Sequence, residues 1–329
     1  MKCKPLKATL LLLFVCVVQT LVFSQDANRQ FDLRPDPIQE YRNQNPPNFR
    51  NNETVSTSPE LIDNDIGIQR PVETKKVGFG YHLGFETKIY HTNNPASVEG
   101  GVFKTSAGVW ENALRNNFLL GAYDLGGASF SPLITLNYSK FTHFGDSLFS
   151  TFDFDSLNLN FVGIFQFSNG WSLRPSLGFT ADLNPRKSLE RQYSQLNPSL
   201  TLGKYFQMNH QIQTFFEWSI AHNFTDSTYI MFGQPDDHMN RFETALLGGL
   251  VVPFGDFEFS PFVRFSLVDY SNKDRTDFLS YLGLQLQYAF SEWFRVKAFA
   301  NLSLRNSNDN SMDFSRFDSG VSAGFDARF

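Results

Sequence analysis

From Lys76 to the C-terminus, apolar and polar residues alternate at nearly every second position. A period of two is typical of a β-strand that has one apolar and one polar face. Similar segments recur around residues 157–167, 171–179 and 212–224, and each is long enough to cross a bilayer as a tilted strand. The first segment places these residues on one face: Val77, Phe79, Tyr81, Leu83 and Phe85. The sequence therefore predicts an all-β protein built from long, two-faced strands.

Short and long connections alternate between these strands. Tight turns are expected at residues 168–170, 207–211, 253–256 and 291–292. Longer polar stretches are found at residues 145–153, 184–194, 225–238, 271–276 and 306–315. Transmembrane barrels of bacteria have short turns on one side of the membrane and longer loops on the other. The Asn169-Gly170 pair is typical of a type I′ hairpin turn.

These connections divide the chain into twelve expected strands. Their ranges are 76–90, 115–124, 129–142, 154–167, 171–182, 195–206, 211–224, 239–252, 256–270, 277–290, 292–305 and 316–329. An even number allows the first and last strands to pair, which closes an antiparallel up-and-down barrel. Gly, Ala and Asn blur the alternation in residues 96–128, where 102–110 is an alternative strand. Ten or fourteen strands therefore remain open alternatives to twelve.

The composition excludes two other classes of protein. The chain has 37 Phe residues and is 16% aromatic, yet its mean hydropathy is −0.27. Apolar residues are thus interleaved with polar ones, which argues against a bundle of membrane helices. The net charge is −5 with both signs dispersed along the chain, so no basic footprint for nucleic acid is present. We therefore expect no nucleic-acid partner.

The chain before the strands divides into two segments. Residues 1–24 have the charged start, apolar stretch and small cleavage-site residues of a signal peptide. Residues 25–75 are rich in Pro and Asn and poor in aromatic residues, which predicts a disordered periplasmic leader. A segment that plugs the pore or docks on a partner is the alternative. The barrel is then expected to span residues 76–329.

The end of the chain carries a family resemblance. One face of the last expected strand holds Phe317, Ser319, Val321, Ala323, Phe325, Ala327 and Phe329. An alternating last strand with a terminal aromatic residue resembles the C-terminal strand of Gram-negative outer-membrane β-barrel proteins, including the porins. The resemblance implies an outer-membrane location, outer-membrane lipid as surroundings, and Phe329 as part of the signal read by the barrel-assembly machinery. It identifies no subfamily.

If the Phe- and Leu-rich face meets lipid, the other face lines the lumen. That face is expected to carry Arg174, Glu217, Glu243, Glu258, Arg264, Arg295, Lys297 and Arg305. The balance of signs favours internal ion pairs that brace the barrel over an ion-selective ring. Arg295, Lys297 and Arg305 are nevertheless the best candidates for contact with an anion. The neighbouring last strand offers Asp318 and Asp326 as structural partners for them.

Bulky residues on the same polar face predict a narrow bore. They are Tyr205, Phe215, Phe262, Tyr270, Tyr281 and Phe299. A barrel of about eight strands is filled by side chains, whereas 16 to 18 strands leave a water-filled channel, so twelve is intermediate. We expect a narrow passive or gated channel for a small hydrophilic solute or a polysaccharide. The alternative is a non-conducting structural or surface-interaction barrel.

The sequence offers no arrangement for catalysis. The six histidines are scattered, and no nucleophile and base fall in a motif that would place them together. Adjacent acids such as Asp236 and Asp237 point apart on a loop, and no spacing typical of a metal site is present. We therefore expect no enzyme, no catalytic residue, no cofactor and no bound metal.

Overall fold

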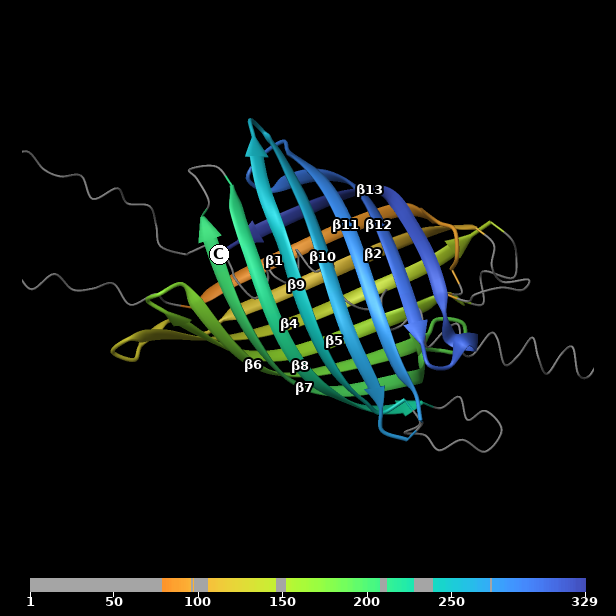
Figure 1. The fold of residues 1–329 in the computed structure, drawn as a ribbon. Coiled ribbons are helices and arrows are strands. Elements are labelled where there is room, and N and C mark those ends of the chain that lie inside the picture. Colours follow the sequence, from red (N-terminus) through yellow and green to blue (C-terminus); the bar gives the residue numbers. More distant parts are fainter. Residues whose placement is uncertain are drawn as a thin grey trace, which may run out of the picture.

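The computed structural model describes residues 79–95, 97, 106–145, 152–207, 212–227, 239–272 and 274–329. In this part of the chain, antiparallel strands follow one another around a closed barrel (Figure 1). Consecutive long strands are neighbours throughout, so the chain has the up-and-down topology predicted from its sequence. The expected signal peptide (1–24) and leader (25–75) lie outside the described residues.

Twelve long strands and one short strand form the sheet. Their bounds are β1 Gly80–Thr92, β2 Ala107–Leu119, β3 Tyr123–Asp124, β4 Ala128–Phe144, β5 Phe154–Phe167, β6 Trp171–Asn184, β7 Glu190–Gln207, β8 Gln213–Ser227, β9 Arg241–Phe254, β10 Phe257–Tyr270, β11 Thr276–Ala289, β12 Phe294–Ser307 and β13 Phe314–Arg328. A single turn of 3-10 helix, η2 (Asn310–Met312), precedes the last strand. Among the described residues, no helix has the length and hydropathy needed to span a bilayer.

The barrel closes where its first and last strands meet. β1 pairs with β13 from His82 opposite Arg328 to Thr92 opposite Asp318. The two chain ends are held further by Phe329, whose N–H donates to the Tyr81 carbonyl at 2.8 Å while its carbonyl accepts from Tyr81 at 3.1 Å. Backbone groups on both end strands are thereby satisfied inside the sheet, which is what a barrel needs in lipid.

The predicted count of twelve spanning strands is confirmed, but the second strand was misplaced. We expected it at 115–124, whereas β2 spans Ala107–Leu119 and pairs with β4 along twelve residues. The short β3 folds back on β4 at Tyr123 and Asp124, at the turn end of the barrel. The alternation on β2 is hard to see in the sequence because Gly108, Ala113 and the Asn residues carry little contrast in hydropathy.

Among the described connections, short turns and longer loops occupy opposite ends, as the sequence indicated. The expected turn at 207–211 and the expected loops at 145–153 and 225–238 lie largely outside the described residues. The turn at 168–170 joins β5 to β6, but it is not of type I′, because Gly170 has positive φ and Asn169 does not. Phe167 accepts a backbone hydrogen bond from Gly170 at 3.1 Å, which makes a three-residue hairpin loop with glycine in the left-handed region. The end of the barrel with these turns also holds the C-terminus (Figure 1).

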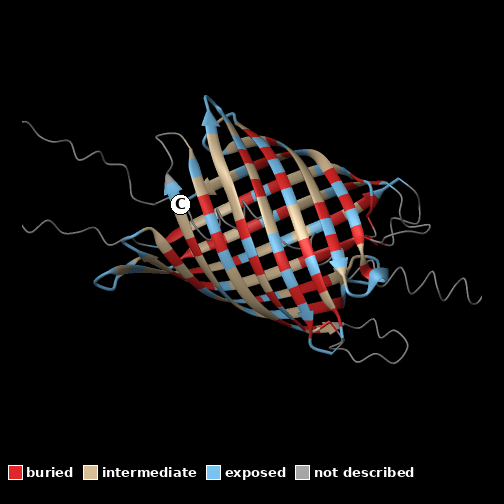
Figure 2. Ribbon diagram, in the orientation of Figure 1, coloured by how far each residue is buried: buried red, intermediate tan, exposed pale blue. Residues whose placement is uncertain are grey.

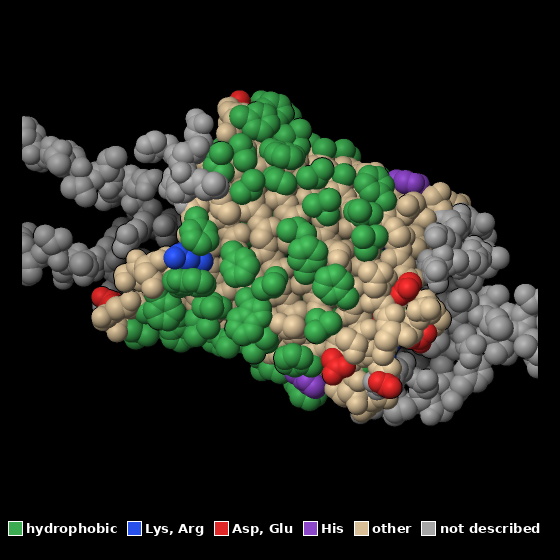
Figure 3. Space-filling model, in the orientation of Figure 1, with side chains coloured by type: hydrophobic (Ala, Val, Ile, Leu, Met, Phe, Trp, Pro, Cys, Tyr) green, Lys and Arg blue, Asp and Glu red, His purple; other side chains and the backbone are tan. Residues whose placement is uncertain are grey.

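Each of the long strands has one more exposed and one more enclosed face. Burial alternates residue by residue along the strands (Figure 2), with Phe265 on β10 43% exposed and Ser266 beside it 4% exposed. Phe and Leu dominate the large hydrophobic side chains on the outward face. On the face drawn in Figure 3, hydrophobic side chains cover the middle, and charged ones lie towards the two ends. Such an apolar band is the surface that a transmembrane barrel presents to lipid.

Candidate functional site: the lumen

Glu86 is the centre of a buried ion-pair network on one wall of the lumen. Its carboxylate accepts from Arg115 of β2 at 2.5 Å, from Lys297 of β12 at 3.0 Å and from the Ser322 hydroxyl of β13 at 2.7 Å. Because β13 joins β1 to β12, barrel closure brings together residues 211 positions apart. One carboxylate therefore compensates two cations, and Ser322 satisfies it further.

A second group of charges lies nearer the turn end of this wall. Arg295 and His82 both contact the Asp326 carboxylate, His82 at 2.9 Å. Asn117 hydrogen-bonds the other ring nitrogen of His82 at 3.0 Å. Asp326 is thus the partner that the sequence offered for Arg295, and this pairing favours a structural role for the arginine.

The opposite wall carries two further pairs. Arg174 of β6 donates to Glu217 of β8 at 2.5 Å, and Arg264 of β10 donates to Glu243 of β9 at 3.2 Å. Glu258, nearer the turn end, accepts from the Ser260 hydroxyl at 3.2 Å. Arg174 spans β7 to reach its partner, which Gly203 on that strand permits, since a Cβ there would lie 3.2 Å from the guanidinium.

Apolar side chains fill another part of the lumen. Phe215, Leu247 and Phe262 form a buried cluster against which Tyr205 and Tyr281 pack. Glycines on the flanking strands make room for Phe262, because a Cβ on Gly283 would lie 2.1 Å from its ring. Four of the six aromatic residues predicted to narrow the bore therefore meet in one place.

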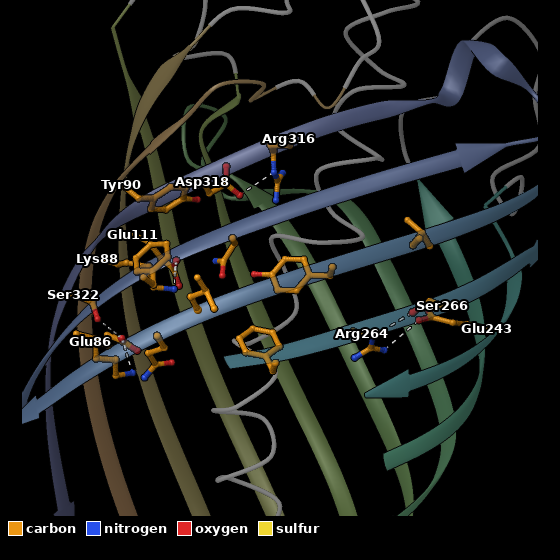
Figure 4. Close-up of a pocket in the computed structure, with 18 of the residues that line it drawn as sticks. Glu86, Lys88, Tyr90, Glu111, Glu243, Arg264, Ser266, Arg316, Asp318 and Ser322 are labelled. Carbon is orange, nitrogen blue, oxygen red and sulfur yellow. Dashed lines mark hydrogen bonds and ion pairs between the residues drawn. The ribbon is translucent and has the colours of Figure 1, made fainter. Parts of the chain in front are cut away.

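A cavity of about 100 Å³ remains between the charged and the apolar walls. Glu86, Lys88 and Glu111 line one side, and Arg264 and Ser266 face them from β10 (Figure 4). Lys88 pairs with Glu111 at 2.9 Å, so this side also balances its own charge. Since one enclosed water needs roughly 10–15 Å³ by this measure, the cavity holds several waters or a small polar group.

The loop end of the lumen contains three arginines that the sequence analysis did not single out. They are Arg241, Arg275 and Arg316, and each is at most 5% exposed. Arg275 pairs with Asp277 at 2.5 Å, and Arg316 pairs with Asp318 at 3.0 Å. These residues begin strands or precede them, so the expected strand interiors did not draw attention to them.

The structure separates the three cations that we predicted as candidates for contact with an anion. Arg295 is bound to Asp326, and Lys297 to Glu86. Arg305 lies at the loop end, where its Nε donates to the Met312 carbonyl. Asp318, the second expected partner, binds Arg316 instead. The three cations therefore have separate surroundings, and only Arg305 lies in the arginine-rich region.

One carboxyl group in the loop contacts outside the spanning strands, that of Asp153, has a shifted pKa. Although burial raises the pKa of Asp153, hydrogen bonds from His143 and the charges of His143 and Arg186 outweigh it and lower the pKa below the ordinary 3.8. The His143 backbone N–H donates to the Asp153 carboxylate at 2.7 Å. This pair ties the end of β4 to the residue preceding β5. Within the described ranges, no three His, Cys, Asp or Glu residues are grouped so that they could hold a metal.

Comparison with known proteins finds likeness in fold only. No family model matches the chain, and no curated protein matches it. Among solved structures, the β domain of the Bordetella autotransporter BrkA gives a TM-score of 0.43 at 10% identity over 75% of this chain and 99% of that chain. The NanC porin gives 0.42 at 11% identity, with coverages of 74% and 98%. The translocator domain of the autotransporter NalP from Neisseria meningitidis gives 0.39 at 7% identity, with coverages of 77% and 90%.

These likenesses are too distant to indicate what the chain binds or transports. The structural class follows from the chain's own structure. It is a closed antiparallel barrel of twelve spanning strands, with short turns at one end, longer loops at the other, and an apolar exterior around a polar interior. These are the features of outer-membrane β-barrels, so the resemblance seen in the C-terminal strand holds at the level of fold.

Proposed function

We propose that this chain is an outer-membrane barrel that acts as a narrow, passive or gated channel for a small hydrophilic solute or a polysaccharide. The single observation that carries the proposal is the cavity inside the lumen, with charged and hydroxyl groups on facing walls. A purely structural interior would be closely packed and would leave no enclosed space for several waters.

The walls of the cavity suit a hydrated solute. Glu86, Lys88 and Arg264 supply charges, and Asn301 and Gln285 supply amides that both donate and accept hydrogen bonds. Tyr90 and Phe299 add aromatic surface at 5.9 Å between ring centres, on which the face of a sugar ring can pack. The apolar cluster around Phe262 restricts the bore, so we expect slow passage of small solutes and exclusion of large ones.

Proteoliposome uptake tests this proposal. The purified full chain is reconstituted, and the entry of uncharged sugars of increasing size is followed by liposome swelling. We expect monosaccharides to enter faster than through protein-free liposomes and uptake to fall steeply with size. Equal rates with and without protein for every solute would reject the channel.

A non-conducting structural barrel is the second candidate, and one observation favours it. Several interior side chains are almost completely enclosed, including Arg174, Phe215 and Asp277 at 2% exposed or less. Such a barrel would serve through its loops, as a surface-interaction protein. Uptake at the protein-free rate, from a sample whose heat-modifiable gel mobility shows a folded barrel, would support this candidate over the channel. We propose no catalytic activity, cofactor or nucleic-acid partner for either candidate.

A further inference from the structure

Three guanidinium groups converge on Tyr270 at the loop end of the lumen. The Arg275 guanidinium carbon lies 4.3 Å from the centre of the Tyr270 ring. Arg241 is the register partner of Tyr270 on β9. Arg305 is paired in register with Leu279, which packs in one buried cluster with Tyr270. All three arginines act electrostatically on the Tyr270 hydroxyl, and each is at most 5% exposed.

Direct carboxylate contacts in this group are fewer than its guanidinium groups. Asp277 is fully buried and binds Arg275 through both carboxylate oxygens, at 2.9 and 2.5 Å. Glu243, which acts electrostatically on Arg241, is held by Arg264. Among the described residues, Asp277 is thus the one carboxylate that is hydrogen-bonded to any of the three guanidinium groups, while Asp309, Asp313 and Glu243 act on them from further away.

Within the described residues, Arg241 hydrogen-bonds only neutral oxygens, and incompletely. One terminal nitrogen donates to the Met239 carbonyl at 3.1 Å, and the other donates to the side-chain oxygen of Gln195 at 3.1 Å. Tyr193 contributes a further hydrogen bond. The Nε atom of Arg241 is buried and has no hydrogen-bond partner within the described part of the chain.

Arg305 also lacks a carboxylate partner among the described residues. Its Nε donates to the Met312 carbonyl, and its guanidinium carbon lies 4.6 Å from the centre of the Phe314 ring. The nearby Asp313 uses one carboxylate oxygen to accept the Ser307 backbone N–H at 2.7 Å. A cation enclosed in this way has lost its water without gaining an anion, which is unfavourable unless an anion binds.

We propose that Arg241, Arg275 and Arg305 form a binding site for an oxyanion: a carboxylate, phosphate or sulfate group carried by the solute. This inference rests on the proposed channel and names the chemical group that the channel would select in its solute. Guanidinium groups present forked donors that match an oxyanion. The site adjoins the cavity, because Val268 and Leu279 line the cavity and also pack with Tyr270. An anion entering from the loop end would meet these arginines before the ion-paired walls beyond.

Anion binding to the detergent-solubilised full chain tests this site without any transport. The thermal unfolding midpoint is measured while phosphate, sulfate or acetate replaces chloride at constant ionic strength. We expect a saturable rise of about 5 °C or more at a hundred-fold excess over Kd for at least one oxyanion. The double variant Arg241→Gln/Arg305→Gln should lose the rise, and Arg305→Gln alone should weaken binding about ten-fold or more.

The control removes two positive charges elsewhere at the loop end. Arg186 and Arg191 are exposed loop-end residues, so Arg186→Gln/Arg191→Gln should keep the full rise. A wild-type midpoint that responds equally to all salts would overturn the site, as would a double variant that binds as well as wild type. If the double variant does not fold, the wild-type titration and the single variant decide. Solute uptake without saturable oxyanion binding rejects this site and leaves the channel standing.

Discussion

Two buried charge clusters in this lumen differ in one respect. The cluster around Glu86 contains a carboxylate that contacts Arg115 and Lys297 directly. In the cluster around Tyr270, Asp277 binds Arg275 and accepts from the Tyr270 hydroxyl. Among the described residues, Arg241 and Arg305 contact carbonyl, amide and hydroxyl oxygens and an aromatic ring. The first cluster braces the closure of the barrel from within. The second leaves positive charge for a ligand to neutralise.

Position in the barrel accounts for the difference. Glu86 lies in β1, next to the seam with β13, where three strands bring their side chains to one point. The Tyr270 cluster lies at the loop end, where arriving solute could supply the missing anion. A brace of directly paired charges and an anion site therefore occupy different parts of one lumen.

The largest effect is expected from Glu86→Gln. Removing this carboxylate leaves Arg115 and Lys297 as buried cations without their anion. Breaking a buried pair in this way costs about 3–5 kcal/mol. Urea unfolding in lipid vesicles, followed by heat-modifiable gel mobility, measures the loss. Adding Lys297→Gln to Glu86→Gln should recover part of it. Strict additivity of the two substitutions would show that the pair is not coupled.

A matched pair of arginine substitutions compares the lumen with the exterior at one depth. Leu282 is 48% exposed on the outer face of β11, next in sequence to Gly283, which pairs with the cavity-lining Asn301 of β12. Leu282→Arg places a charge in hydrocarbon and should cost about 2–4 kcal/mol near mid-membrane. Asn301→Arg should cost much less, because its charge enters a polar cavity. Equal losses in vesicle unfolding would mean that the two faces are assigned wrongly.

Arg305→Gln should change stability by less than about 1 kcal/mol, far less than Glu86→Gln. Its removal leaves no carboxylate without a partner and reduces repulsion with Arg275. The same urea unfolding series measures it in chloride buffer. A loss as large as that of Glu86→Gln would contradict the comparison, since it would show that Arg305 is part of the structural brace.

The smallest effect is expected outside the spanning strands, at Asp153. Because contacts with His143 and Arg186 lower the pKa of Asp153, its ionised form stabilises the fold above about pH 3.8, and this contribution disappears as the pH falls through the lowered value. Asp153→Asn should therefore lower the melting temperature at pH 6 by about 1–3 °C and have little effect at pH 2. Melting curves at both pH values check this, and an equal effect at both would contradict it.

The barrel itself could be predicted from the sequence because its pattern is local. The alternating faces of β5, β10 and β13 can be seen in consecutive residues of the sequence, and the hairpin turns have recognisable turn residues. β2 was misplaced because its Ala and Asn residues fit either face. The turn at Gly170 was assigned the wrong type because an Asn-Gly pair is also compatible with a three-residue loop.

The site could be predicted only in part, because its partners are distant in sequence. The alternation of residues along each strand identified the enclosed face, and this placed Lys297 and Glu217 in the lumen. It could not show that Lys297 meets Glu86, since that contact depends on barrel closure. Nor could it reveal Arg241, which gains its importance from being next to Tyr270 on another strand.

The most direct test of the channel is the current through single molecules in a planar bilayer under a salt gradient. We expect discrete small steps whose reversal potential shows a preference for anions in wild type. Arg241→Gln/Arg305→Gln should retain the steps and lose most of that preference, because the remaining lumen charges are largely paired. Folded wild-type protein that inserts and gives no steps under any gradient would contradict the channel.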